Sequence, residues 1–479
     1  MYERDIEMTQ IREADENRNI TNAASAIITA LMTALFAAVW LLFYNSIVFC
    51  THQVLGAVCS ILVWTVLYLM FSKTYRAFKI ASCAIGETAF SQFLSIGFAD
   101  LIMWVAGCLA ARYYVNILPG AATVVVQVIV GFVWATKAKQ YFLNHVQPRE
   151  CLLLYEKNDE AANARSFAEK IENTYGHLFR ITRRFPVGDD LTAVCNEIYR
   201  YPVVFIDTIN LEKRQRVMKY CIDTGKQVYM TPTVQDVIAR GYDVKHFIDT
   251  PTLGYNGGFK IKQTYVGKRT LDVIISLLMI VVTSPIMLVA AIAIKIEDHG
   301  KILFKQKRVG LNGRVFNILK FRSMVEDAEK DGKPRPCTVG DPRVTKVGKI
   351  LRSTRADELP QLFNILKNDI SLIGPRAERI EQQELYSKEL PEFSYRLRVK
   401  AGLTGYAQAY GKYNTSPRDK LLMDLLYIEQ QSFLTDLKIF FLTVKTVFTP
   451  EATEGFDDEK SKAINAKAAD ENIKETANV

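Results

Sequence analysis

Four long apolar stretches near the N-terminus constrain this chain more than any other feature. They cover residues 24–48, 53–72, 82–111 and 116–136. Each is close to the roughly 20 residues that a helix needs to cross a bilayer. The first twenty residues are too charged for a signal peptide. The sequence therefore predicts a bundle of four transmembrane helices, and buried helices of a soluble protein are the alternative.

Positive charge indicates how this bundle is oriented. Lys73, Arg76 and Lys79 lie between the second and third stretches, and Lys137 and Lys139 follow the fourth. The other two connections carry almost no Lys or Arg. Because cytoplasmic loops are enriched in these residues, both ends of the bundle are predicted to be cytoplasmic.

A fifth apolar run, from Leu271 to Ile296, has a different pattern. Ser284 and Pro285 lie at its middle, where proline removes a backbone donor and is expected to bend a helix. Basic residues flank both ends, which favours keeping both on the cytoplasmic side. A reentrant helix that enters one leaflet, breaks at Ser284-Pro285 and returns would satisfy this pattern. A kinked spanning helix is the alternative.

Between Glu150 and Asp243 the pattern changes to buried strands that alternate with amphipathic helices. This alternation predicts a small Rossmann-like α/β domain with a parallel sheet. The domain lacks the G-x-G-x-x-G turn that lets a backbone approach a pyrophosphate, which favours a structural or regulatory role. The expected strands are 151–155, 203–207 and 227–230, and the expected helices lie near 159–173, 189–199 and 210–224.

Charge and cysteine usage narrow the class of ligand. The net charge is +9, and the basic excess lies between Phe259 and Pro450. Such a domain beside hydrophobic segments suits anionic lipid headgroups or phosphorylated substrates, whereas no recognisable nucleic-acid module is present. The eight cysteines form no C-x-x-C motif, so neither a disulfide framework nor a zinc site is indicated.

Two adjacent carboxylates mark the candidate site, in "STRADELPQLFNILKNDISLIGPRAE" (353–378). Apolar residues repeat at helical spacing after Pro360, which can only occupy the first turn of a helix. Asp357 is therefore expected at or near the N-cap, with Glu358 just inside. Neighbouring helical side chains diverge by about 100°, so this pair would serve two roles on one ligand, such as nucleophile and metal ligand. Two capping acids are the alternative.

Cations gather around this pair in the sequence. Arg grips phosphate oxygens through two parallel hydrogen bonds, and so many cations would repel one another unless an anion were bound. A solvated basic face is the alternative for any single residue. The candidate phosphate-binding residues are Arg308, Lys320, Arg322, Arg352, Arg355 and Arg376.

Residues 268–450 resemble the bacterial sugar transferases, the monotopic polyprenyl-phosphate phosphoglycosyl transferases. The resemblance rests on "KRTLDVIISLLMIVVTSPIMLVAAIAIKI", "FKQKRVGLNGRVFNILKFRSM", "DPRVTKVGKILRSTRADELPQLFNILKNDISLIGPR" and "KAGLTGYAQ". The four preceding apolar stretches and the α/β domain are similar to the longer members. Ala377 departs from the family, which usually has Pro after Gly-Pro-Arg, and this puts only local geometry in doubt.

The resemblance implies an enzyme that catalyses a two-step transfer. Asp357 would attack the β-phosphate of a UDP-sugar and release UMP, and polyprenyl (undecaprenyl) phosphate would then collect the sugar phosphate. Glu358 would hold Mg²⁺. The implied location is the bacterial cytoplasmic membrane, with the catalytic domain on the cytoplasmic face, and the implied role is to start an exopolysaccharide, capsule or O-antigen. A possible homodimer is also expected.

Two other classes of function fit the sequence less well than this enzyme does. A catalytically inert membrane scaffold or sensor of polysaccharide assembly is disfavoured by the intact Asp357, Glu358 and Arg376. A transporter would need paired charges within the first four apolar stretches, which are nearly free of them. The enzyme is therefore the preferred interpretation.

The expected architecture is mixed: a four-helix transmembrane bundle, an α/β domain and a mainly α catalytic domain with a reentrant helix. The expected segments are 1–22 (cytoplasmic N-terminus), 23–140 (transmembrane domain), 148–250 (α/β domain), 251–267 (linker), 268–450 (reentrant helix and catalytic domain) and 451–479 (disordered tail).

Overall fold

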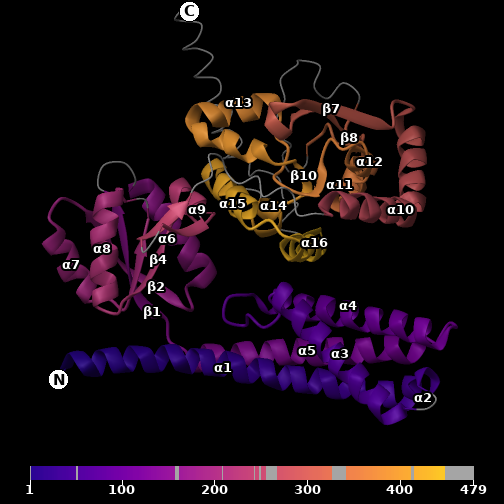
Figure 1. The fold of residues 1–479 in the computed structure, drawn as a ribbon, viewed down its shortest axis with the longest axis horizontal. Coiled ribbons are helices and arrows are strands. Elements are labelled where there is room, and N and C mark those ends of the chain that lie inside the picture. The colour runs from indigo at the N-terminus through magenta and orange to yellow at the C-terminus, as the bar shows by residue number, and fades with distance from the viewer. Residues whose placement is uncertain are drawn as a thin grey trace, which may run out of the picture. The chain divides into compact units, whose positions relative to one another are not determined.

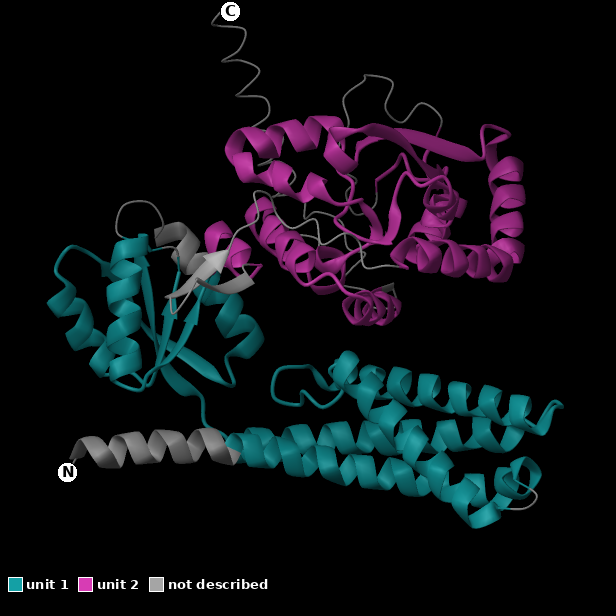
Figure 2. Cartoon of the chain, viewed as in Figure 1, with its two compact units in different colours: residues 1–231 teal, residues 232–479 magenta. Residues whose placement is uncertain are grey.

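A computed structural model describes residues 2–49, 52–156, 161–207, 209–241, 243–247, 250–254, 267–325, 341–411 and 415–447. The chain divides into two compact units, Met1–Thr231 and Pro232–Val479 (Figure 2). The tail predicted to be disordered, 451–479, lies outside the described residues, as does most of the predicted linker 251–267.

The first unit begins with long apolar helices at the four predicted apolar stretches. The first helix, α1, runs on through one π-helical turn (Trp40–Tyr44) into α2. Segments 17–48, 53–74, 85–111 and 118–145 are each long and apolar enough to cross a membrane. The helices are α1 (Tyr2–Val39), α2 (Asn45–Val48), α3 (Gln53–Thr74), α4 (Ile85–Ala111) and α5 (Leu118–His145).

Polar side chains inside this bundle pair with one another. Trp64 Nε1 of α3 donates to Asp100 Oδ1 of α4 at 2.6 Å, and Tyr68 Oη donates to Gln92 Oε1 at 2.7 Å. The Trp64 and Tyr68 rings are stacked with 5.3 Å between centroids. Asp100 is therefore a contact between helices within the bundle.

A parallel four-stranded sheet with the order β2-β1-β3-β4 follows the helices (Figure 1). Successive β1 residues face opposite sides, so Leu152 and Leu154 enter one core cluster and Cys151 and Leu153 the other. The predicted parallel sheet is confirmed, but the expectation that 227–230 forms a buried strand is wrong, because three of the four residues of β4 are exposed. Its elements are β1 (Arg149–Glu156), α6 (Ala161–Tyr175), β2 (Phe179–Val187), α7 (Leu191–Tyr199), β3 (Val203–Ile206), α8 (Leu211–Asp223) and β4 (Gln227–Met230).

Strand β2 was not among the predicted strands. Its sequence, "FRITRRFPV", holds three arginines, and only Ile181 and Val187 of this strand are buried. An edge strand with one partner does not need the continuous apolar run of a central parallel strand, so periodicity alone did not reveal it.

The second unit is mostly helical, with three two-stranded sheets among the described residues. Its core holds Leu362, Phe393, Leu425 and Tyr427, together with Val237 from α9. The elements are α9 (Val234–Ala239), β5 (Asp243–Phe247), β6 (Thr250–Gly254), α10 (Lys268–Asp298), β7 (Leu303–Val309), β8 (Val315–Phe321), α11 (Lys346–Ser353), α12 (Gln361–Leu366), β9 (Ser371–Ile373), α13 (Ile380–Glu389), β10 (Gly402–Thr404), α14 (Tyr406–Tyr410), α15 (Pro417–Glu429) and α16 (Phe433–Val447).

Helix α10 contains the fifth apolar run and is also long and apolar enough to cross a membrane. Pro285 lies inside it, and Figure 1 shows the helix bending partway along its length. Ser284 and Pro285 are exposed, and the Ser284 hydroxyl donates to the Val281 carbonyl at 2.8 Å. The bend is expected because proline removes one helical hydrogen bond and clashes with the preceding turn.

Both ends of α10 are bonded to the same unit. At its start, Lys268 forms an ion pair with Asp436 of α16, and Asp272 accepts hydrogen bonds from Ser371 Oγ (2.7 Å) and Leu372 N (3.1 Å). At its end, Asp298 pairs with Arg322, and Glu297 accepts from the Lys346 N–H at 2.7 Å. The N-terminal Lys268 is thus a buried structural cation, 3% exposed.

Candidate active site

Asp357 and Glu358 lie together in a 3₁₀ turn (Ala356–Glu358) that precedes α12. The prediction that Asp357 caps this helix, with Glu358 just inside, is wrong. Helix α12 begins at Gln361, and Pro360 occupies its N-cap position. Because proline has no N–H and clashes with the carbonyl four residues earlier, the acids form a separate turn ahead of the helix.

Glu358 is held between two cations. Its Oε1 lies 2.7 Å from Lys320 Nζ and 3.8 Å from Arg376 Nη2. Burial alone would raise the pKa of Glu358, but the charges of Lys320 and Arg376 outweigh it and lower the pKa to about 2. Glu358 is therefore ionised at physiological pH.

Asp357 has the opposite environment. Its residue is 8% exposed, and burial, reinforced by the charge of Glu358, raises the pKa of its carboxyl group above the ordinary value. The charges of Lys320, Arg352 and Arg355 oppose this rise without cancelling it. Two neighbouring carboxylates whose pKa values are pushed apart are typical of a pair that divides catalytic roles.

A β-hairpin brings Lys320 to the acidic turn. Strands β7 and β8 are antiparallel, and Phe304 pairs with Lys320. The side chain of Asn364, in α12, accepts from the Leu319 N–H at 2.9 Å and donates to the Asn317 carbonyl at 2.9 Å. Asn364 therefore fixes the hairpin against the helix that follows the acids. It was not among the predicted site residues.

Arg352 and Arg355 flank the acidic turn from the N-terminal side. Arg355 precedes the turn in the left-handed region, with φ of 57°. Arg352 Nε donates to Ser323 Oγ at 2.8 Å. Because both charges lower the pKa of Asp357, the structure brings these two predicted residues to the candidate site.

Arg308 and Arg322 make protein contacts instead of pointing free into the site. Arg308, 8% exposed, donates to the Ala377 carbonyl at 2.9 Å and to Gln306 Oε1 at 2.7 Å. Burial and the charge of Arg376 lower its pKa to about 10. Arg322 forms its ion pair with Asp298 at the end of α10. Both side chains hold parts of the fold together around the acids.

Three buried charged residues behind Arg376 were missed by sequence reasoning. Arg396 forms an ion pair with Asp424 of α15, with 2.6 Å between Nη2 and Oδ2, and a longer one with Glu378 at 3.6 Å. They lie far apart along the chain, and only Glu378 belongs to a quoted motif. No sequence signal connects Arg396 with Asp424.

The carboxylates suit a magnesium ion completed by a substrate. Among the described residues, no group of three or more His, Cys, Asp or Glu could hold a metal by itself. Mg²⁺ is commonly bound by one or two carboxylates together with substrate phosphates and water. Glu358 is ionised and adjoins Asp357, so its carboxylate could supply such a ligand. The residues present fit the predicted cofactor.

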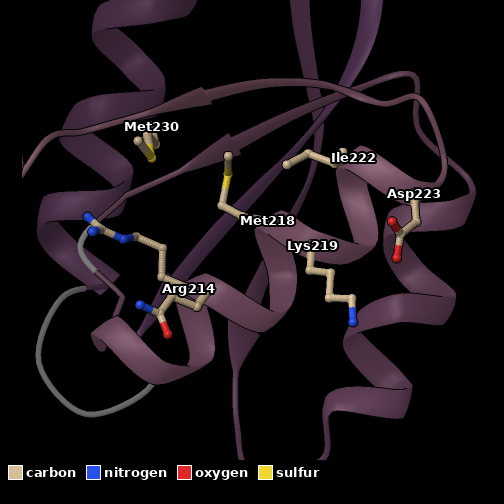
Figure 3. A pocket seen from close by; sticks show the side chains of 7 residues that line it. Arg214, Met218, Lys219, Ile222, Asp223 and Met230 are labelled. Atoms are coloured by element: carbon tan, nitrogen blue, oxygen red, sulfur yellow. The ribbon is translucent and has the colours of Figure 1, made fainter. Parts of the chain in front are cut away.

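A separate cavity of about 330 Å³ belongs to the first unit (Figure 3). Helix α8 and the last residue of β4, Met230, line it, and Arg214, Lys219 and Asp223 carry its charges. None of the predicted site residues lines this cavity.

Comparison with known proteins identifies the family. Residues 263–450 match the bacterial sugar transferase family. The chain is 41% identical over 190 residues to a UDP-glucose:undecaprenyl-phosphate glucose-1-phosphate transferase of Caulobacter vibrioides, covering 38% of this chain and 70% of that protein. The chain belongs to the bacterial sugar transferase family.

Other relatives in this family are longer than the matched region. The chain is 42% identical over 185 residues to an Aeromonas hydrophila UDP-N-acetylgalactosamine-undecaprenyl-phosphate N-acetylgalactosaminephosphotransferase, covering 38% of this chain and 44% of that protein. It is 42% identical over 209 residues to a Klebsiella pneumoniae UDP-glucose:undecaprenyl-phosphate glucose-1-phosphate transferase, covering 43% of each. The match thus spans less than half the length of these two bacterial sugar transferases.

Proposed function

We propose that this protein transfers a sugar 1-phosphate from a UDP-sugar to polyprenyl phosphate through an aspartyl-phosphosugar intermediate on Asp357. One observation carries the proposal: a buried carboxyl group with a raised pKa adjoins an ionised one held by Lys320 and Arg376. The names of the relatives support the substrate class.

In the first step, a carboxylate oxygen of Asp357 bonds to the β-phosphorus of the UDP-sugar. The bond between that phosphorus and the oxygen bridging to the α-phosphate breaks, and its electron pair leaves with UMP. The product is a mixed anhydride between Asp357 and the sugar phosphate. A carboxylate with a raised pKa is the more basic, and so the better, nucleophile once ionised.

In the second step, a phosphate oxygen of the polyprenyl phosphate bonds to the same phosphorus. The bond from phosphorus to the Asp357 oxygen breaks, which restores the carboxylate and forms a polyprenyl-diphosphate sugar. Splitting the transfer in this way replaces one difficult displacement with two simpler ones.

The cations around the acids have separate tasks in this scheme. Arg376, whose side chain is 40% exposed, can grip phosphate oxygens, and Lys320 keeps Glu358 ionised. Arg352 and Arg355 add positive charge beside Asp357. Glu358 would hold Mg²⁺, which when bound neutralises diphosphate charge.

The lipid acceptor requires that the site lie at a membrane surface, and α10 supports this. A straight helix of 31 residues would be about 46 Å long. Its two ends are nevertheless bonded to one compact unit, and apolar side chains near the bend, such as Val282 and Val289, are 67% exposed. We therefore favour a reentrant helix that breaks at Ser284-Pro285 and enters one leaflet.

The proposed setting follows from the acceptor and from the charge pattern. The catalytic unit would face the cytoplasm at the bacterial inner membrane, where the lipid-linked sugar begins an exopolysaccharide, capsule or O-antigen. The predicted homodimer belongs to the same proposal, and crosslinking in native membranes checks it.

Trapping the intermediate tests the proposal. Membranes that hold the protein are given UDP-sugars of several kinds without acceptor, and the intact protein is weighed by mass spectrometry. The expected result is a gain of one sugar phosphate, absent from Asp357→Asn. UMP release by that variant should fall at least about a thousandfold, while Glu384→Gln, an exposed acid, serves as the control. Full turnover by Asp357→Asn would refute the mechanism.

A further inference from the structure

The backbone that carries Arg376 is fixed at four consecutive carbonyl groups. The Pro375 carbonyl accepts from the Gly402 N–H at 2.9 Å, and the Glu378 carbonyl accepts from the Val309 N–H at 3.0 Å. Between them, the two middle carbonyls each accept from a guanidinium group. Such complete bonding leaves this segment little freedom to shift.

Arg396 supplies one of these two guanidinium groups. Its Nη2 donates to the Arg376 carbonyl at 2.8 Å, and Arg308 Nη1 donates to the Ala377 carbonyl at 2.9 Å. We propose that Arg396, locked by Asp424 and Glu378, is a positioning residue that sets where the Arg376 side chain enters the active site. This inference rests on the proposed function, because it assumes that Arg376 binds substrate phosphate.

Buried charged groups hold the Arg396 side chain in place. Arg396 is 3% exposed and Asp424 is 1% exposed. Asp424 Oδ2 accepts from Arg396 Nε at 2.9 Å, and the Nη2 atom lies 2.6 Å from the same oxygen. The guanidinium carbon also lies 4.7 Å from the centre of the Phe393 ring. The ion pair with Asp424 and the nearby Phe393 ring therefore both restrain the guanidinium group.

Glu378, two residues after Arg376, is the second carboxylate that holds Arg396. Its carboxylate pairs with Arg396 Nη1 at 3.6 Å. Burial would raise the pKa of Glu378, but the charges of Arg396 and Arg376 lower it below the ordinary value. Arg396 thus contacts the residues on both sides of Ala377.

A lysine could not reproduce this arrangement. Lysine keeps the positive charge but has one nitrogen, whereas Arg396 uses Nε, Nη1 and Nη2 toward different partners. The planar fork of arginine is the feature that lets one side chain hold a carboxylate and a carbonyl together. Substitution by lysine therefore separates geometry from charge.

A double-mutant cycle tests the inference with the full-length chain in membranes and a UDP-sugar. We expect Arg396→Lys to lower kcat/KM by between about tenfold and a hundredfold, as a displaced substrate-binding group does. In an Arg376→Ala background the same change should cost less than about twofold, because residues that act through one another are not additive. Arg398→Lys, on the same segment beside the Tyr395 ring, is the matched control.

The outcomes separate the two proposals. If Arg376→Ala leaves turnover intact, the role that the proposed function gives to Arg376 fails. The positioning role is overturned if Arg376→Ala lowers turnover and Arg396→Lys lowers kcat/KM by the same factor with or without Arg376. It is also overturned if Arg396→Lys is fully active. Should Arg396→Lys fail to fold, Asp424→Asn replaces it in the cycle and is judged by the same criteria.

Discussion

Lys320 Nζ lies 2.7 Å from Glu358 Oε1, and the same ammonium group also lowers the pKa of the adjoining Asp357. Glu358 nevertheless has a pKa of about 2, whereas burial keeps the pKa of Asp357 above its ordinary value. One cation therefore acts on two neighbouring carboxyl groups whose pKa values are shifted in opposite directions.

Replacing Lys320 should raise the pKa of both acids. In Lys320→Met, we expect the acid limb of the pH–activity profile to move to higher pH and the rate at pH 7 to fall by about tenfold or more. Lys305→Met, an exposed lysine in β7, is the control. An unchanged acid limb would show that Lys320 does not govern these carboxyl groups.

The same change should alter stability against acid. A group whose pKa is depressed in the folded state stabilises the fold above its unfolded value, and this contribution is lost as the pH falls through the folded pKa. For Glu358 the interval runs from 4.5 down to about 2. We therefore expect the melting temperatures of the wild type and Lys320→Met to converge toward pH 2, and parallel curves would contradict this.

Asp357 should lower stability at neutral pH. Because its pKa is raised in the folded state, the unfavourable effect of its charge is present above the folded pKa and disappears as the pH falls below the unfolded one. Asp357→Asn should therefore melt at a higher temperature at pH 7, by roughly 2–4 °C for each kcal/mol gained. The difference should shrink near pH 3, and a variant that is less stable at pH 7 would contradict the prediction.

Much of the fold follows from the spacing of apolar residues. The four apolar helices, α10 and the strands β1 and β3 were predicted from continuous apolar runs, and β4 was predicted as a buried strand although three of its four residues are exposed. Strand β2 was not, because an edge strand with arginines such as Arg183 and Arg184 lacks that run. Periodicity identifies elements through their apolar runs, so an element whose run is interrupted by arginines, such as β2, escapes it.

The candidate site was predicted less completely than the fold. The sequence placed Asp357, Glu358, Lys320 and Arg376 in one group, because so many cations near two acids would repel one another unless an anion were bound. It did not reveal that Arg308 would donate a hydrogen bond to the Ala377 carbonyl. Such a contact depends on which backbone groups the tertiary fold leaves without another partner. Buried pairs between distant segments have no periodic signature.

Helix α9 should stabilise the catalytic unit, although it follows the parallel sheet closely in sequence. Val237 is 1% exposed and packs into the core that contains Leu421 and Leu425. Val237→Ala removes two methyl groups and should lower the free energy of unfolding of this unit by about 2 kcal/mol. Denaturant unfolding, monitored through the loss of transferase activity, measures this change in free energy. Val315→Ala, 48% exposed, is the control, and equal effects of the two changes would contradict the assignment.

If α10 is reentrant, both of its ends face the same side of the membrane. Thr270 and Lys301 are exposed residues near the two ends, so Thr270→Cys and Lys301→Cys should both react with an impermeant maleimide added from the cytoplasmic side. The unaltered chain corrects for its native cysteines. Pro285→Ala restores the missing backbone donor and should favour a straight helix, which would reduce labelling at one end. If the two ends are labelled from opposite sides in the parent background, α10 spans the membrane and the reentrant arrangement is wrong. The reason is that a helix with both ends on one side must turn back within the membrane, and a spanning helix does not.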